Sequence, residues 1–324
     1  MTKPGRAEID QIAEATIAAL RAPSILNTQP WRWQLSSAHA ELWADRTRQL
    51  PGLDPDGRLL LLSCGTALHH AMVALRAAGF TAHVERRPDP ARPDLVARLR
   101  RGPSAPPDDE LYRAIYQRRT DRRPFADEPP TAAVVEELRM AVERHAVHLY
   151  AVPPGELTAF AAAVAHASAV EYDDAGMRDD VLAWTTRTRD DRDGVTPRSV
   201  TPPGRRTIAP RNLSPARPSA LAPGPGQDRG TVYAILVIDT DEPRDWLAAG
   251  EALSDVWLTL TARGLAASPI SEVIEVEPVR QALRRHFGGV GFPAIALRIG
   301  VPVTGADPVP PAVRRSGTDV IGLP

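Results

Sequence analysis

The strongest constraint on the fold is a pair of long apolar segments that share one residue pattern. Residues 58–79 and 243–264 are both rich in Ala and Leu, which predicts two long, largely buried helices. Each contains Gly-x-Ala-Leu followed by a Leu and then a Gly at the same spacing, beginning at Gly65 and at Gly250. The match arises either by chance or from two related halves. Because a small residue permits close approach of a partner helix, related halves would meet along these segments.

Composition limits the class of protein. The chain has 324 residues, enough for two domains or one large fold, and 43% of them are hydrophobic, enough for a core. A net charge of −1 argues against a nucleic-acid-binding protein. The single cysteine, Cys64, excludes a disulfide framework, and its neighbours His69 and His70 are expected in the core, so we predict no metal site. A polar N-terminus and the lack of a membrane-length apolar run predict a cytoplasmic protein with no membrane partner.

Periodicity and turn residues place the other elements. Helices are expected over 8–21, 108–118, 131–145, 154–172, 177–189 and 278–287. Strands are expected over 31–35, 41–44, 81–85, 95–100, 147–152, 231–239 and 293–300. Residues 102–107 are predicted to be a Pro-rich loop, and the tail from Val301 to be extended. An α+β fold follows, with one unit over 1–105 and a second over 106–324.

Residues 194–227 interrupt the second unit. They contain eight Pro and five Arg but no acidic residue, and they show little apolar periodicity. A connection of this length is either a functional loop, such as a lid over a site, or a linker.

Three polar clusters are candidates for ligand binding. Residues 22–31, APSILNTQPW, form either a capped turn or a rigid rim that offers hydrogen bonds to a flat polar ligand. Residues 117–125, QRRTDRRPF, contain four Arg after a predicted helix, which suits either a solvated helix end or a phosphate. A weaker basic pair, Arg314 and Arg315, lies in the tail.

Together these clusters resemble motifs of the flavin-dependent nitroreductase superfamily. APSILNTQPW is similar to its (A)PSxxNxQPW motif, and QRRTDRRPF resembles its R-x-[ST]-x-[RK] phosphate motif. Residues 268–272, SPISE, then PAIALRIGVP and the basic pair follow in the order of that family. The resemblance spans Ala22 to Arg315 and points in particular to the Acg-like NAD(P)H nitroreductases, which are single chains of similar length.

The order of the motifs implies a fusion. A standard nitroreductase chain carries the arginine motif before NxQPW and dimerises, so that each flavin takes its phosphate ligands from one subunit and its rim from the other. Here NxQPW lies in 1–105 and the arginine motif opens 106–324. The resemblance therefore implies a nitroreductase-like fold of two degenerate halves, an internal pseudo-dimer with one FMN site per chain. Residues 194–227 lie outside the resemblance and, from their composition, are expected to form a lid-like loop or a linker. Such a chain is a monomer or dimerises again as a homodimer.

The resemblance also implies which residues hold FMN. They are Pro23, Ser24, Asn27, Gln29, Arg118, Thr120, Arg122, Pro269, Ile270, Ser271, Arg314 and Arg315. The arginine motif would hold the phosphate, helped by the tail pair with Arg315 favoured over Arg314. The first motif would line the flavin ring from the opposite half. Ser271 stands where many nitroreductases have Glu, and no triad or carboxylate pair predicts a catalytic side chain.

Three functions remain open at this point. The resemblance implies a ping-pong oxidoreductase, in which NAD(P)H reduces FMN by hydride transfer and an electron-poor small molecule then takes its place. The alternative is an FMN-binding or flavin-sequestering protein with little turnover, because the lid closes the site. Segment 194–227 could also bind the phosphates of NAD(P)H. The third function is an Arg-rich interaction protein in which this segment binds an acidic partner.

Overall fold

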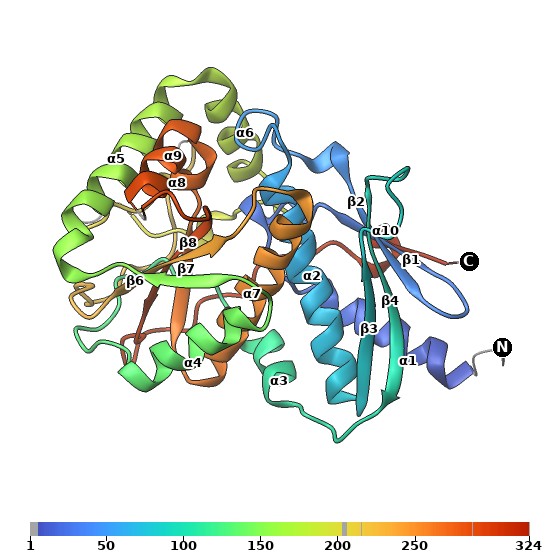
Figure 1. Ribbon diagram of the computed structural model, residues 1–324. Helices are drawn as coiled ribbons and strands as arrows, with labels where there is room; N and C mark the ends of the chain where they lie inside the picture. The colour runs from blue at the N-terminus through green and yellow to red at the C-terminus, as the bar shows by residue number, and fades with distance from the viewer. Residues whose placement is uncertain (1–5, 203–205, 215, 287, 324) are drawn as a thin grey trace.

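Two β-sheets lie on either side of a central pair of helices (Figure 1). The computed structural model describes residues 6–202, 206–214, 216–286 and 288–323. The central helices are α2 (Arg58–Ala77) and α7 (Pro243–Ala262), which pack against each other along much of their length. They are the two helices predicted from the shared sequence pattern.

The contact between α2 and α7 depends on two glycines. A Cβ atom on Gly65 would overlap the carbonyl oxygen of Leu247, and one on Gly250 would overlap that of Leu62. Either added carbon would also lie 2.9 Å from the Cα atom of the opposite glycine. Real Cβ contacts are not this short, so both positions require glycine for the backbones to approach. The contact between α2 and α7, here called the α2–α7 seam, therefore lies at equivalent positions of the shared pattern. That the chain consists of two related halves stays a prediction.

The first sheet has the strand order β3-β4-β2-β1-β9. Its strands are β1 (Trp31–Leu35), β2 (Ala40–Ala44), β3 (Phe80–Arg86), β4 (Leu95–Ser104) and β9 (Ile321–Gly322). Neighbours are antiparallel except β9, which joins β1 in parallel. In β1 the side chains of Trp31, Trp33 and Leu35 are buried and alternate with exposed residues, as the period of a half-buried strand requires. This sheet and α1 (Arg6–Ala19) enclose one core with α2.

The second sheet is antiparallel, in the order β5-β6-β8-β7. Its strands are β5 (His148–Ala151), β6 (Val232–Ile238), β7 (Ala266–Ile270) and β8 (Phe292–Gly300). The central strands β6 and β8 are almost wholly apolar and buried. They form a second core with α7.

The other helices flank this framework. They are α3 (Glu110–Gln117), α4 (Ala132–Glu143), α5 (Leu157–Asp173), α6 (Ala175–Thr185), α8 (Glu272–Glu275), α9 (Glu277–His286) and α10 (Gly317–Val320). Short 3₁₀ turns occur at η1 (Ile25–Asn27), η2 (Arg46–Arg48), η3 (Pro154–Glu156) and η4 (Pro197–Ser199). Helices α3 and α4 pack on α7, whereas α5, α8 and α9 group beside the second sheet. Phe287, the last residue of the helix predicted over 278–287, lies outside the described residues.

Three predictions from the sequence need correction. Strand β4 continues to Ser104 through a stretch predicted as loop, because a shift in register where it pairs with β3 accommodates Pro103. Strand β7 was not predicted; it contains Pro269, which an edge strand tolerates since one side needs no ladder hydrogen bonds. The tail is not merely extended, because α10 and β9 return it to the first sheet.

Segment 194–227 contributes to the second core. Its Val195, Val200, Ile208 and Leu213 are buried in that core. Positions 203–205 and 215 of the segment lie outside the described residues. The division of the chain near residue 105 stays a prediction.

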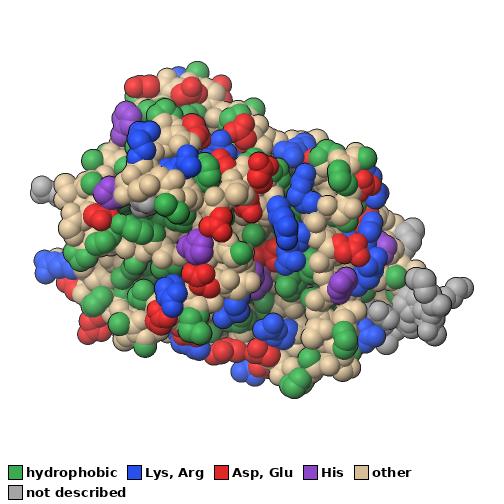
Figure 2. Space-filling view, viewed as in Figure 1, with side chains coloured by type: hydrophobic (Ala, Val, Ile, Leu, Met, Phe, Trp, Pro, Cys, Tyr) green, Lys and Arg blue, Asp and Glu red, His purple; other side chains and the backbone are tan. Residues whose placement is uncertain are grey.

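Charge and hydropathy agree with this architecture. Acidic and basic side chains are interspersed over the face shown in Figure 2. Among the described residues α2 is the one helix that is long and apolar enough to cross a membrane, and 83% of its apolar stretch is buried inside the protein. Its apolar sequence is therefore accounted for by its central position.

Candidate functional site

A large cavity brings the predicted motifs together. Its empty volume is about 1410 Å³, counted out to its open mouth. Ten of the predicted site residues line it: Pro23, Ser24, Asn27, Arg118, Thr120, Arg122, Pro269, Ile270, Ser271 and Arg314. They come from the η1 turn, the end of α3, the end of β7 and the tail, so positions far apart in the sequence converge on one space.

The turn around η1 has an unusual backbone. Leu26, Asn27 and Gln29 have φ angles of 42°, 56° and 48°, in the left-handed region that non-glycine residues rarely adopt. Hydrogen bonds hold this shape: Ser24 Oγ accepts from the Gln29 amide at 2.9 Å, and Asn27 Nδ2 donates to the carbonyl oxygen of Gly194 at 3.0 Å. Backbone strain of this kind clusters at functional sites.

Arg118 is the most unusual side chain of the cavity. It follows α3 directly and is only 5% exposed. Its Nε and Nη1 atoms meet no hydrogen-bond partner among the described residues, and its guanidinium lies 4.7 Å from the ring centre of Trp257. Burial, and then the nearby charge of Arg314, holds the pKa of Arg118 well below its usual range. The cavity therefore presents a buried cation without an anion.

Two further arginines add positive charge to the lining of the cavity. Burial lowers the pKa of both Arg122 and Arg314 to about 10. Arg122 donates to the carbonyl oxygen of Ser199 at 2.9 Å, and Arg314 donates to Asn27 Oδ1 at 2.8 Å. The Nε atom of Arg314 meets no partner among the described residues.

Gln29 and Arg315 are not among the residues that line this cavity, and their contact with FMN stays a prediction. Gln29 is buried and ties the tail to the turn, since its Oε1 accepts from the Arg315 amide at 2.9 Å. The Arg315 guanidinium donates to the carbonyl oxygens of Gln29 and Asp319. Arg314 rather than Arg315 faces the cavity, because neighbouring residues of an extended chain point to opposite sides.

The sequence also missed basic residues of segment 194–227 that line the cavity, notably Arg206 and Arg211. Arg211 pairs with Glu171 Oε2 at 3.0 Å and with Glu275 Oε1 at 2.9 Å, and it donates to Ser271 Oγ. The signal was present as an Arg-rich segment without acidic residues, but nothing in the sequence showed which arginine would turn inward.

Glu272 is the one carboxylate that lines the described cavity. It is 3% exposed, and burial raises its pKa to about 7 despite the opposing effect of Arg211. Glu272 directly follows Ser271, which stands where many nitroreductases have a Glu.

Two proteins of known sequence are similar to this chain over most of its length. "Putative NAD(P)H nitroreductase Rv3131" of Mycobacterium tuberculosis H37Rv is 38% identical over 318 residues, which cover 94% of this chain and 89% of that protein. "Putative NAD(P)H nitroreductase acg" of the same strain is 32% identical over 312 residues, covering 94% and 93%. No protein-family model matches the chain.

Two solved structures overlap with part of the chain. A nitroreductase with bound FMN from Bacteroides fragilis is 13% identical and gives a TM-score of 0.41, covering 65% of this chain and 97% of that one. A nitroreductase with bound FMN from Desulfitobacterium hafniense is 14% identical with a TM-score of 0.39, covering 63% and 95%.

The family follows from these relatives, which are 38% and 32% identical to this chain and cover 94% of it. The chain belongs to the Acg-like family of NAD(P)H nitroreductases.

Proposed function

We propose that this protein is an FMN-dependent oxidoreductase of the nitroreductase type, which transfers a hydride from NAD(P)H to an electron-poor small molecule. The observation that carries the proposal is the buried guanidinium of Arg118, which lines the cavity with two nitrogen atoms unpartnered among the described residues. An unpaired buried charge is costly, and a guanidinium matches a phosphate group in shape and charge. The phosphate of FMN would supply the missing anion.

The other lining residues suit the rest of FMN. Arg122 and Arg314 would share the phosphate with Arg118, while the strained η1 turn offers Ser24 and Asn27 to the polar edge of the ring. Apolar side chains such as Ile270 suit its flat face. Bound FMN supplies the hydride-accepting and hydride-donating chemistry; the residues of this chain bind it, orient it and exclude water.

A ping-pong order is the simplest use of this cavity. The described motifs converge on one space, so that NAD(P)H and the acceptor would enter by the same mouth in turn. Glu272 is the one carboxylate along the described lining, and hydride transfer itself needs no protein base.

A second candidate function is flavin sequestration with little turnover. Segment 194–227 favours it, because its Ile208, Pro210 and Leu213 line the cavity and its Arg211 is held by two buried or partly buried glutamates. Acting as a lid, the segment would keep both substrates away from the flavin.

The deciding experiment is anaerobic reduction of the purified, FMN-loaded full-length chain. For the oxidoreductase, NADH or NADPH bleaches the flavin absorbance and an added nitroaromatic or quinone restores it. For the sequestering protein, dithionite bleaches the flavin but neither nicotinamide does so at a useful rate. A chain that neither purifies with FMN nor takes it up contradicts both.

The phosphate assignment is tested separately by Arg118→Ala combined with Arg122→Ala. We expect loss of at least 100-fold in FMN affinity, because two charge-assisted contacts to phosphate disappear. Fluorescence quenching on titration with FMN measures the affinity. Arg113→Ala is the matched control, because Arg113 lies on α3 with its side chain 71% exposed. The Arg113→Ala variant should bind FMN as the wild type does. Unchanged FMN affinity in the double variant would refute the assignment.

A further inference from the structure

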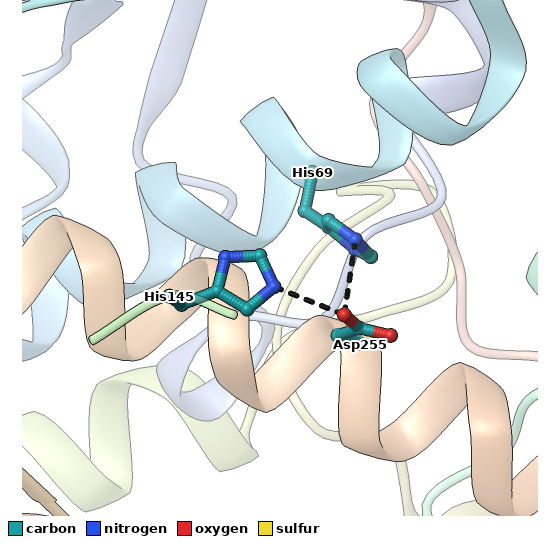
Figure 3. A group of neighbouring side chains, drawn as sticks. All are labelled: His69, His145 and Asp255. Atoms are coloured by element: carbon teal, nitrogen blue, oxygen red, sulfur yellow. Dashed lines mark hydrogen bonds and ion pairs between the residues drawn. The ribbon is translucent and has the colours of Figure 1, made fainter. Parts of the chain in front are cut away.

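A second cluster of ligand-type side chains lies outside the cavity, between α2 and the second half of the chain. Figure 3 shows His69, His145 and Asp255 pointing toward one another from three separate segments. His69 projects from α2 and Asp255 from α7, whereas His145 follows the end of α4. One ligand atom from each residue lies within 4.8 Å of the others.

The distances are close to those of a metal site. His145 Nε2 lies 3.0 Å, and His69 Nε2 3.9 Å, from Asp255 Oδ2. Zinc bonds of about 2.0–2.1 Å in tetrahedral geometry place ligand atoms about 3.3 Å apart. The two observed separations bracket that value, so small side-chain movements bring all three atoms onto one ion.

The orientation of His69 is fixed by a neighbour. Its Nδ1 atom hydrogen-bonds Ser254 Oγ at 2.8 Å, and the same hydroxyl contacts His70 Nδ1 at 2.9 Å. With its Nδ1 atom held by Ser254, His69 turns its Nε2 atom toward the carboxylate of Asp255. A metal ion bound here would take the place of the proton between Nε2 and the carboxylate. Hydrogen bonds of this kind orient the histidine ligands of metal sites.

Burial and access also suit a metal. The Asp255 side chain is 5% exposed and that of His69 8%, whereas that of His145 is 11% exposed and marks the side nearest solvent. A water molecule entering beside His145 would complete a four-coordinate shell.

We propose that His69, His145 and Asp255 bind one first-row transition-metal ion, best suited to Zn²⁺, which ties α2 to α7 and the end of α4. Two imidazoles and one carboxylate favour Zn²⁺ over Mg²⁺, which prefers oxygen ligands. One competitor is visible: Arg144 Nη2 lies 3.1 Å from Asp255 Oδ2 and 3.3 Å from Oδ1. Its guanidinium occupies the same carboxylate, so the metal must displace it. The exposed side chain of Arg144 can turn into solvent.

The test is calorimetric titration of the full-length, FMN-loaded chain with Zn²⁺, after chelator treatment and without a histidine tag. We expect one Zn²⁺ per chain and a melting temperature that rises with Zn²⁺ concentration, with no such rise in Mg²⁺. His145→Gln should weaken Zn²⁺ binding at least tenfold. Arg144→Gln should tighten it several-fold, because it frees the carboxylate. An adventitious surface site would not respond in opposite directions to these two variants.

The matched control is His148→Gln. His148 lies close along the chain and contacts Glu143 and Asp239, but its side chain is 49% exposed and belongs to no such cluster among the described residues. The His148→Gln variant should bind Zn²⁺ as the wild type does. Absence of Zn²⁺ binding by the wild type, binding by His145→Gln within twofold of it, or unchanged binding by Arg144→Gln would each overturn the proposal. Flavin retention and circular dichroism verify that each variant is folded.

Discussion

At the scale of single residues, the proposed FMN site holds a buried charge that lowers the stability of the fold. Arg118 is a buried cation that contacts the ring of Trp257 and, at 3.5 Å, the carbonyl oxygen of Arg21. The charges that act on it come from other arginines. No carboxylate forms an ion pair with it among the described residues, unlike Arg211, which has Glu171 and Glu275. The charge of Arg211 is therefore compensated within the fold, whereas the uncompensated charge of Arg118 favours a role in ligand binding.

This contrast predicts that Arg118→Met stabilises the protein when FMN is absent. The substitution removes a buried unsatisfied charge but also the contact with Trp257, so the net gain should be about 1 kcal/mol. Urea unfolding of the FMN-free chain measures it, and added FMN should no longer stabilise the variant. A marked loss of stability in the FMN-free variant would show that Arg118 has a structural role. Arg113→Met, on the exposed face of α3, should change neither quantity.

At the scale of elements, the α2–α7 seam forms part of the wall of the proposed FMN site. The η1 turn contacts α2, and residues of α2 and α7 such as Ser63 and Leu253 line the cavity. Ser63 Oγ accepts from the Ile25 amide at 3.1 Å, so that α2 also positions the turn. Any change in the separation of these helices should therefore be felt both in stability and in FMN binding.

Gly65→Ala tests the seam. The added methyl group would collide with backbone atoms of α7, which cannot move away as a flexible side chain could. We expect a loss of about 3 kcal/mol, the upper part of the range for overpacked sites, measured as a lower urea midpoint. Gly155→Ala is the control, since nothing lies within 4 Å of its added Cβ. If the two variants were equally stable, the close approach of α2 and α7 would be in doubt.

At the scale of the whole molecule, the tail connects the two sheets. After β8 it passes the cavity, where it contributes Arg314, and then adds β9 to the edge of the first sheet. Asn27 and Arg314 are hydrogen-bonded although 287 positions separate them in the sequence. The tail and the turn of residues 22–31 thus meet at the same part of the proposed FMN site.

The proposed fusion of two degenerate halves predicts one FMN per chain. Among the described residues the arginine motif and the η1 turn meet at a single cavity, and each occurs once in the chain. The ratio of flavin absorbance to protein, determined after denaturation, should be close to one whether the chain is a monomer or a dimer. A ratio of two would contradict the interpretation of two degenerate halves.

Much of the candidate site could be predicted because its motifs are short and local. The turn of residues 22–31 and the arginines of 117–125 are each specified by neighbouring residues, and both line the cavity. The family resemblance based on them is confirmed by relatives along nearly the whole chain. Most helices and strands follow likewise from local periodicity, as the central helices α2 and α7 show.

What local sequence left open was decided by long-range packing. Arg314 faces the cavity and Arg315 does not, because β9 and Gln29 fix how the tail passes the turn. Helices α2 and α7 bring His69 to Asp255, residues that no local pattern connects. The sequence by itself determined which chemical groups are present and which local shapes they favour. Only the tertiary structure decided which groups meet, because burial and direction depend on contacts between residues far apart in the chain.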